Sequence, residues 1–137
     1  MRLLIWHVDS FTAEPTERGR SKIADTEPPV ARVEDGLVVF AAVEKGDEPE
    51  PLAVAGRAAA AIAEVARQLG AQRVLLHSFA HLFVELSAPK VAREVLNETQ
   101  RLLEAEGYAV SQSAFGWFNR LEMKAKGHPL SRVARQV

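Results

Sequence analysis

The pattern of hydrophobic and polar residues divides the chain into segments typical of strands and helices. The nearly continuous apolar runs Leu3–Val8 and Leu37–Val43 predict buried strands, the second at the centre of a sheet. A shorter apolar run, Val74–His77, predicts a third strand. The segment from Phe11 to Asp35 is charged and contains three prolines, so we expect a long connection there, with room for one short strand.

Two further segments have the spacing of packed helices. Apolar residues recur at helical intervals over Pro51–Leu69, Gly70 supplies a stop, and an alanine-rich face predicts close packing on a sheet. Pro89 suits a first helical turn, and the apolar positions after it carry a second helix to Gly107. The residues from Pro129 onward are expected to form a short terminal helix.

The stretch Ala114–Leu130 has the most informative pattern. Tyr108–Ser111 leads into it, and it begins with a turn at Phe115-Gly116. Strand alternation places Trp117, Asn119, Leu121 and Met123 on one face, and Phe118, Arg120, Glu122 and Lys124 on the other. Asn119 is the polar exception on its face. Such a side chain is either satisfied by hydrogen bonds, the commoner case, or directed at a ligand, and we advance the second as a hypothesis.

In chain order these elements are β-β-α-β-α-β-β-α, with room for an extra strand near the start. This order indicates an α/β layered domain with helices packed on a mixed sheet. The 137 residues suit a single domain, residues 1–137, and the apolar fraction of 47% is normal for a globular protein. No internal repeat or linker divides the chain.

The charge balance restricts the class of partner. A formal net charge of −1 argues against a protein that grips a long phosphate backbone, but it leaves room for one that accepts only the tip of an RNA. The absence of cysteine excludes disulfides and thiolate chemistry. With no signal-peptide pattern and no apolar run long enough to span a membrane, we expect a soluble, cytoplasmic protein.

Familiar catalytic motifs are missing, since the chain has neither a Gly-rich phosphate loop nor a GxSxG elbow. His77 and His81 are four residues apart, but the chain between them is expected to pass from strand to loop. Without cysteines or a nearby set of carboxylates, neither a metal nor another cofactor is expected. Ser78, His81 and Asp9 could be combined into a triad, as chance allows in any chain of this length.

His81 alone is a better candidate than that triad. It follows a strand end among small and aromatic residues, where pockets form in α/β sheets, and a neutral imidazole there could hold a hydroxyl or a water. The alternative is a structural histidine bonded to the backbone. Lys126-Gly127-His128-Pro129 could touch a phosphate, although such a segment is more often simply a turn.

Five segments, in order and at similar spacing, together resemble the N-terminal editing domain of archaeal threonyl-tRNA synthetases. They are His7-Val8-Asp9, Val43-Glu44-Lys45, Phe79-Ala80-His81-Leu82, Ala114-Phe115-Gly116 and Lys126-Gly127-His128-Pro129-Leu130. The resemblance spans nearly the whole chain. It implies a fold like that of the D-aminoacyl-tRNA deacylases, and domains of this family usually pair as homodimers.

The activity that the resemblance implies is hydrolysis of serine wrongly esterified to threonine tRNA. Serine lacks one methyl group of threonine, and a missing methylene is worth only about 1–3 kcal/mol of discrimination in binding. A synthetic site therefore accepts some serine, and a second site must remove it. That second site can spare the larger threonyl ester by steric clash in a tight pocket.

The resemblance also implies which residues form the site. The seryl group and terminal adenosine would lie among Val43, Ser78, Phe79, Ala80, Ala92, Phe115, Gly116, Trp117 and Phe118, beside His81. In this family the attacking water is thought to be positioned mainly by backbone groups and by the ribose hydroxyl of the substrate. Orientation and oxyanion stabilisation can suffice because an ester is already activated.

The chain departs from the family pattern at two positions. The family commonly has a lysine where this chain has Asn119, and an acidic residue where it has Arg132. Arg120 points to the opposite face of its strand and should not replace that lysine. We therefore hypothesise that Arg132, on the expected terminal helix, restores the positive charge and that Asn119 supplies a hydrogen bond.

Two alternatives to seryl-tRNA editing remain open. One is a D-aminoacyl-tRNA deacylase, although its paired Ser-Gln and Gly-Pro motifs are echoed only in part, at Ser111-Gln112-Ser113-Ala114. The other is a non-catalytic module that binds tRNA ends or free amino acids, which the loss of the lysine at Asn119 favours. Synthetase core domains could act with this chain in cis or in trans. A patch of Arg18, Arg20 and Lys22 could meet the tRNA, although exposed cations are usually just solvated.

Overall fold

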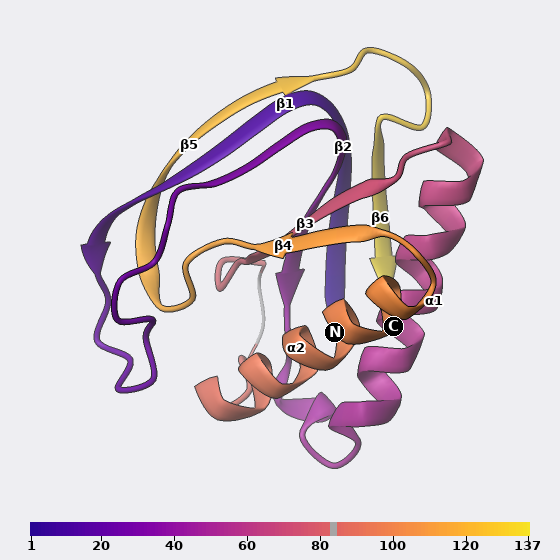
Figure 1. Ribbon diagram of the computed structural model, residues 1–137. Helices are drawn as coiled ribbons and strands as arrows, with labels where there is room; N and C mark the ends of the chain where they lie inside the picture. The colour runs from indigo at the N-terminus through magenta and orange to yellow at the C-terminus, as the bar shows by residue number, and fades with distance from the viewer. Residues whose placement is uncertain (83–84) are drawn as a thin grey trace.

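A six-stranded mixed sheet forms the frame of the molecule (Figure 1). The computed structural model describes residues 1–82 and 85–137. The strands run in the order β4-β3-β2-β1-β5, with β6 also paired to β1. Pairing is parallel between β2 and β3 and between β3 and β4, and antiparallel elsewhere. The strands are β1 (Arg2–Arg18), β2 (Ala31–Ala42), β3 (Arg73–Ser78), β4 (Ala109–Gln112), β5 (Trp117–Ala125) and β6 (Arg132–Gln136).

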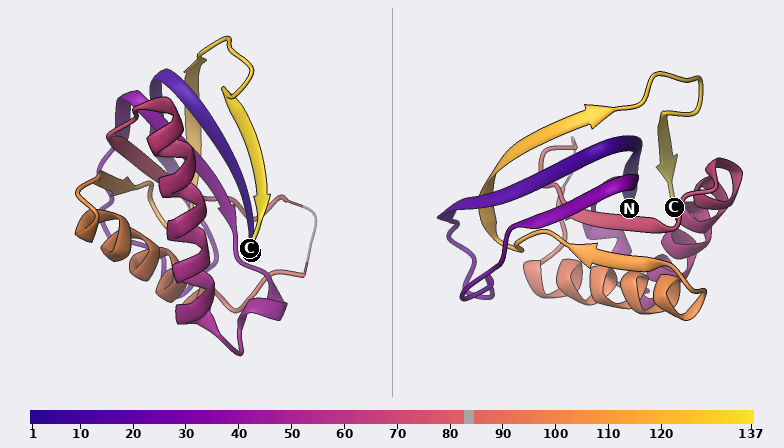
Figure 2. Two further views of the ribbon diagram at one scale, coloured as in Figure 1. Left: turned by 90° about the vertical axis from the view of Figure 1, so that its right-hand side faces the viewer. Right: turned by 45° about the horizontal axis from the view of Figure 1, so that its top comes forward.

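The long first strand is shared by two partners on one edge. Its first half, Arg2–Trp6, pairs with β6, and the half that runs from Val8 to Arg18 pairs with β5. The β1–β5 register shifts between Val8 and Ser10, an irregularity of the kind that bends a strand. Strands β1, β2 and β5 consequently arch over β3 and β4 (Figures 1 and 2).

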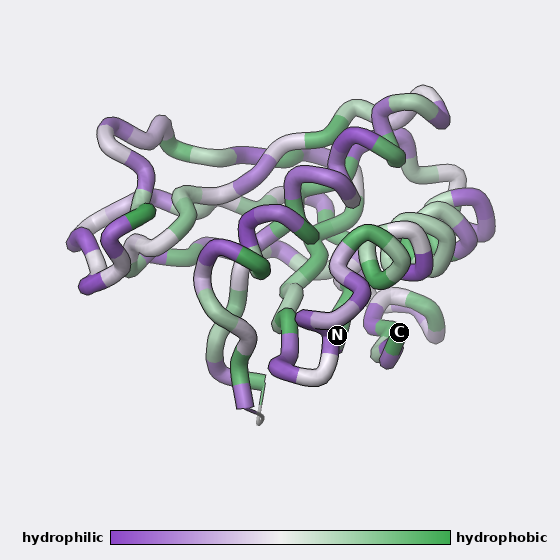
Figure 3. Tube along the Cα trace, turned by 90° about the horizontal axis from the view of Figure 1, so that it is seen from below, coloured by the Kyte–Doolittle hydropathy of each residue, from purple (hydrophilic) through white to green (hydrophobic). Residues whose placement is uncertain are grey.

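Two helices cover one face of the sheet (Figure 2). Helix α1 (Pro51–Leu69) ends at Gly70, whose left-handed φ of 66° suits a glycine. Helix α2 (Pro89–Ala105) alternates hydrophilic and hydrophobic residues along its turns (Figure 3), and only part of its surface is buried. The short 3-10 helix Lys45–Asp47 links β2 to α1. No helix in the described ranges is long and apolar enough to cross a membrane.

The sheet has a different hydrophobic core on each face. The helix side buries aliphatic residues from α1, α2 and the strands, including Ile5, Val39 and Leu76. The opposite side is smaller and more aromatic, built around Phe11 and Phe40. The smaller core lies beneath the arch formed by β1, β2 and β5. At the open end of the arch, this face of the sheet is not filled by the chain.

Most predicted elements are confirmed, but two predictions are wrong. The expected connection from Phe11 to Asp35 shrinks to residues 19–30, because β1 continues to Arg18 and β2 begins at Ala31. At the start of this stretch Phe11 and Ala13 are buried and the residues between and after them are more exposed, a strand pattern that the charges and Pro15 obscure. The expected terminal helix is strand β6, in which Val133 is buried between exposed neighbours, so its period is two and not helical.

Gly36 provides a direct test of the close β2–β3 contact. A Cβ at Gly36 would lie 2.6 Å from the carbonyl oxygen of Arg73, so Gly36→Ala should lower the free energy of unfolding by about 1–3 kcal/mol. Gly56→Ala is the matched control, because nothing lies within 4 Å of its added Cβ and alanine favours a helix interior by about 1 kcal/mol. Denaturant unfolding would measure both, and equal stability of the two variants would contradict the packing.

Candidate functional site

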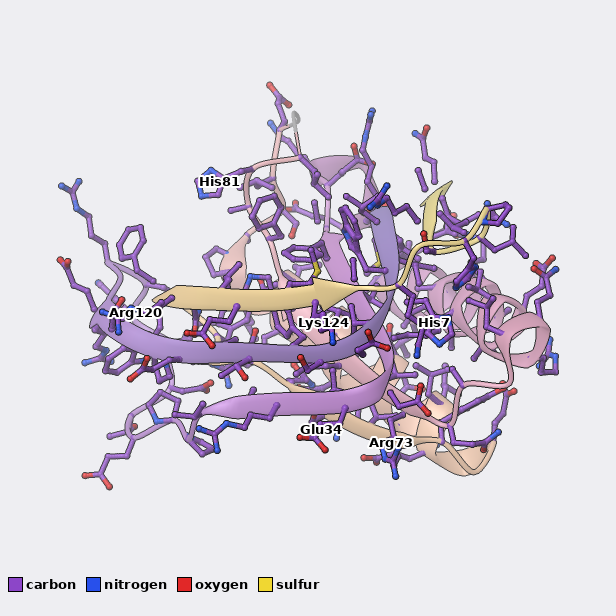
Figure 4. The ribbon with its side chains drawn as sticks, turned by 90° about the horizontal axis from the view of Figure 1, so that it is seen from above. His7, Glu34, Arg73, His81, Arg120 and Lys124 are labelled. Atoms are coloured by element: carbon purple, nitrogen blue, oxygen red, sulfur yellow. The ribbon has the colours of Figure 1, made fainter. Side chains whose placement is uncertain are left out.

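A cavity of about 470 Å³ lies between β5 and the loop that follows β3. Its size is within the usual range for small-molecule sites, and its lining is mainly apolar. Figure 4 shows His81 projecting from the loop beyond the edge of β5, on the side away from β1 and β2. The lining comes from four separate parts of the chain, which are residues 19–21, the end of β2, the region from β3 to α2, and residues 115–121.

The loop after β3 forms one wall. The Phe79 N–H donates to the Ala41 carbonyl at 2.9 Å, which holds the start of the loop against β2. A turn follows at Ala80-His81, and neither of these two N–H groups donates to another described residue. Adjacent backbone N–H groups that face a cavity can bind an anionic oxygen.

The opposite wall is the turn at Phe115-Gly116, held by the segment between β1 and β2. Gly116 has a φ of 75°, and an added Cβ would lie 2.8 Å from the Ala24 side chain. The Gly19 N–H donates to the Gly116 carbonyl at 2.8 Å. This turn therefore requires a glycine for its backbone angle and for the close approach of Ala24.

Asp25 braces this wall through contacts in three directions. Its carboxylate accepts the Phe115 N–H at 2.8 Å and the Arg93 guanidinium at 2.8 Å, while its carbonyl accepts the Trp117 indole N–H at 2.8 Å. Arg93 also lies over the Phe115 ring, 4.6 Å from its centroid. We call Asp25, Arg93, Phe115 and Trp117 the brace, since together they tie helix α2 and the β1–β2 connection to the cavity wall.

Two polar atoms in the lining are buried without a partner among the described residues. Asn119 donates through Nδ2 to the Trp117 carbonyl at 3.0 Å, and this bond fixes which way the amide points. Its Oδ1 and the hydroxyl of Ser21 have no hydrogen-bond partner. An unpaired buried acceptor is costly, so these atoms mark places where a ligand's polar groups can bind.

His77 lies in the floor of the cavity as a neutral imidazole. Its Nδ1 is 2.7 Å from the hydroxyl of buried Ser113, and Phe11, Phe40 and Phe79 surround its ring. Burial lowers the pKa of His77 to about 4. It can therefore donate or accept a hydrogen bond at neutral pH, but it is a weak base.

A pair of histidines lies away from the cavity, with His7 on β1 and His128 in the β5–β6 connection. His7 Nδ1 and His128 Nε2 are 2.9 Å apart, and Lys126 binds Asp9 at 2.8 Å and Asp35 at 3.1 Å. Burial, and then the charges of Lys126 and His128, lower the pKa of His7. The described residues contain no group of three or more histidines and carboxylates placed to hold a metal ion.

The cavity brings together all but one of the residues selected from the sequence. Those in its lining are Val43, Ser78, Phe79, Ala80, His81, Ala92, Phe115, Gly116, Trp117, Phe118 and Asn119. Arg132 does not line it. The residue lies on β6 and not on a helix, with its guanidinium 5.0 Å from the centre of the Trp6 ring. The position assumed for Arg132 is thus wrong, and the idea that it approaches the cavity from a terminal helix loses its basis.

Sequence reasoning missed three kinds of lining residue. Gly19 and Ser21 belong to a segment with no periodicity, so only the folded chain brings them to the cavity. His77 was weighed as a metal ligand, although its partner is Ser113. Leu121 could have been found, because it shares the face of β5 that carries Asn119.

Comparison with known proteins assigns the family. The model of the archaea-specific editing domain of threonyl-tRNA synthetase matches residues 1–137. The chain belongs to this family. It is similar to the threonine–tRNA ligases of Methanopyrus kandleri, at 46% identity over 139 residues, and of Thermococcus gammatolerans, at 38% over 140. The match covers 100% of this chain but only 22% of each ligase.

The editing domain also has a solved structural neighbour. The c-Myc DNA Unwinding Element Binding Protein superposes with a TM-score of 0.68 at 11% identity, over 100% of this chain and 99% of that one. At that identity the similarity concerns the fold alone. The mixed α/β, D-aminoacyl-tRNA deacylase-like fold expected from the sequence is confirmed.

Asp25 is the test of the brace in this editing domain. Asp25→Asn can keep only one of its two carboxylate hydrogen bonds, so we expect the free energy of unfolding to fall by about 1–2 kcal/mol. Trypsin should also cut faster at Arg20 and Lys22, because the segment they belong to is released. Glu27→Gln, which changes an exposed carboxylate two residues away, should stay within about 0.5 kcal/mol of wild type. Unchanged cleavage of Asp25→Asn would contradict the brace.

His77 should make the editing domain sensitive to acid. Its folded-state pKa is about 4 and the unfolded value is 6.5, so the unfolded chain binds the proton first as pH falls. Stability from this group is complete above pH 6.5 and declines toward pH 4, by roughly 3 kcal/mol in total. Denaturant unfolding of wild type and His77→Gln across this range would isolate the effect. The same slope in both proteins would show that His77 does not cause it.

Proposed function

We propose that this chain hydrolyses L-seryl-tRNA(Thr) and spares L-threonyl-tRNA(Thr). Membership of the editing-domain family supports the class of reaction, which is hydrolysis of an aminoacyl-tRNA ester. The observation that supports the site most strongly is the buried Oδ1 of Asn119, which has no partner in residues 1–82 and 85–137, in an otherwise mainly apolar cavity. A seryl ester brings a compact ammonium group, which is the donor that such an acceptor lacks.

In the proposed complex, the seryl group and the terminal adenosine occupy the cavity. The α-ammonium donates to Asn119 Oδ1, and apolar walls surround the Cβ of the amino acid. Serine fits, whereas the extra methyl of threonine meets atoms braced by Asp25 and Arg93. A rigid wall matters here, because a wall that yields to one methyl group cannot discriminate against it.

The reaction then needs positioning more than a strong base. A water attacks the ester carbonyl carbon, and the N–H groups of Ala80 and His81, which donate to no other described residue, stabilise the negative oxygen of the tetrahedral intermediate. The bond to the ribose oxygen breaks, and that oxygen takes the proton that the attacking water loses, with the neighbouring ribose hydroxyl assisting the transfer. Free serine and a tRNA with an unmodified terminal ribose are the products.

The same scaffold supports a proposal for the assembly. Leu121 and Met123 on β5 are 39% and 41% exposed, next to the smaller aromatic core. An exposed apolar face without a covering helix suits pairing with a second copy. We propose that this domain pairs as a homodimer and that it acts with a synthetase core, in cis or in trans, a partner that its similarity to threonine–tRNA ligases supports.

Deacylation assays decide between this function and its alternatives. Charged threonine tRNA should lose L-serine quickly and keep L-threonine. Loss of a D-amino acid alone would make the chain a D-aminoacyl-tRNA deacylase. Binding of the charged tRNA without hydrolysis of any ester would indicate that the chain is a non-catalytic module.

Asn119 is the residue through which to test the site. Asn119→Ala removes the acceptor for the ammonium, so kcat/KM for L-seryl-tRNA(Thr) should fall about tenfold to a hundredfold. Arg132→Ala is the control, since its guanidinium packs on Trp6 outside the cavity. It should deacylate at the wild-type rate. A loss of activity in Arg132→Ala with none in Asn119→Ala would refute this assignment.

A further inference from the structure

We propose that Arg18, Arg20, Lys22 and Lys90 bind the phosphates of the RNA strand whose aminoacylated end enters the cavity. We call these four residues the basic rim. The proposal rests on the proposed function, because it assigns the RNA contacts of the same site. It goes further in naming a surface outside the cavity that holds the rest of the substrate.

The position of the basic rim follows from its neighbours in the chain. Gly19 and Ser21 line the cavity, and Arg18, Arg20 and Lys22 flank them on either side. All three cations are exposed to solvent, whereas Gly19 and Ser21 are half-buried. In this segment the small residues therefore face the cavity, and the cations are available to an RNA strand at the cavity entrance.

Lys90 joins this segment through the brace. Pro89, which precedes it, lines the cavity. Arg93 follows Lys90 by three residues on the same face of α2 and binds both the Ile23 carbonyl and the Asp25 carboxylate. The first turn of α2 is thereby attached to the β1–β2 connection, and Lys90 in that turn is exposed.

The charges of the basic rim are not neutralised within the described part of the chain. None of its four cations forms an ion pair there. In contrast, Arg93 pairs with Asp25, Arg120 with Glu14, and both Lys124 and Lys126 with Asp9. Both cations of β5, Arg120 and Lys124, which Figure 4 labels, are thus already paired.

A small set of free cations suits a short length of RNA. The net charge of −1 gives the molecule no general attraction to nucleic acid. Phosphate contacts position a nucleic acid, and each contact releases counterions, so the salt dependence of binding counts them. Four cations beside one cavity can position a single strand without holding a long duplex.

The test separates RNA binding from hydrolysis. The probes are a short RNA hairpin with a single-stranded 3′ end of sequence CCA, and serine esterified to adenosine. The rim variant R18Q/R20Q/K22Q is compared with R57Q/R67Q/R101Q, which removes three exposed helical cations outside the cavity lining. Fluorescence anisotropy at several salt concentrations measures hairpin binding, and serine release measures hydrolysis of the small ester.

We expect the rim variant to bind the hairpin at least about tenfold more weakly than wild type. The slope of log binding constant against log salt should fall by about 2, from three single-strand phosphate contacts. Lys90→Gln should weaken binding by a smaller factor, and the helical control should match wild type. The small ester contains no phosphate, so its hydrolysis should not depend on the basic rim.

Two results would overturn the basic rim. One is wild-type hairpin affinity and salt slope in the rim variant, and the other is an equal loss in the helical control. Wild-type protein that releases no serine from the small ester would instead count against the proposed function. In that case the hairpin measurements still decide whether the basic rim binds RNA.

Discussion

Strand β1 is the constraint on which the rest of the structure depends. It is hydrogen-bonded to β2 along one edge, and to β6 and then β5 along the other, with a register shift between Val8 and Ser10. This exchange of partners bends the strand and carries β5 across the end of the parallel strands (Figure 1). The cavity lies between β5 and the loop after β3, and it depends on the bend in β1 that holds β5 away from that loop.

The cavity wall is rigid for a reason that matters to discrimination. Asp25 accepts hydrogen bonds from the Phe115 N–H, from one guanidinium nitrogen of Arg93 and from the Trp117 indole, so the turn at Gly116 cannot shift without breaking several bonds together. Contacts within one network are coupled, and their combined effect exceeds that of separate bonds. Discrimination against one methyl group requires a rigid wall. A methyl group changes the binding free energy by only about 1–3 kcal/mol, and a flexible wall would move to accommodate it.

The site has few polar groups, and they differ in whether they already have a hydrogen-bond partner. His77 is neutral and tied to Ser113, whereas Asn119 Oδ1 and the Ser21 hydroxyl are unpaired among the described residues. A site of this kind recognises a ligand by completing its own hydrogen bonds, and it rejects ligands that cannot do so.

The sequence by itself determined most of the regular elements, the family and just over half of the residues that line the cavity. Helices α1 and α2, the central strands and β5 follow from local periodicity, and five short segments carried the family resemblance. Tertiary structure decided the course of residues 11–18 and the strand at Arg132, because the pairing of β1 with β5 and with β6 overrides the charges and prolines that suggested otherwise. It also brought Gly19 and Ser21 to the cavity and Arg93 to Asp25. Arg93 and Asp25 are 68 residues apart in the chain, and Gly19 bonds to Gly116 across a longer separation, so no local pattern records these contacts.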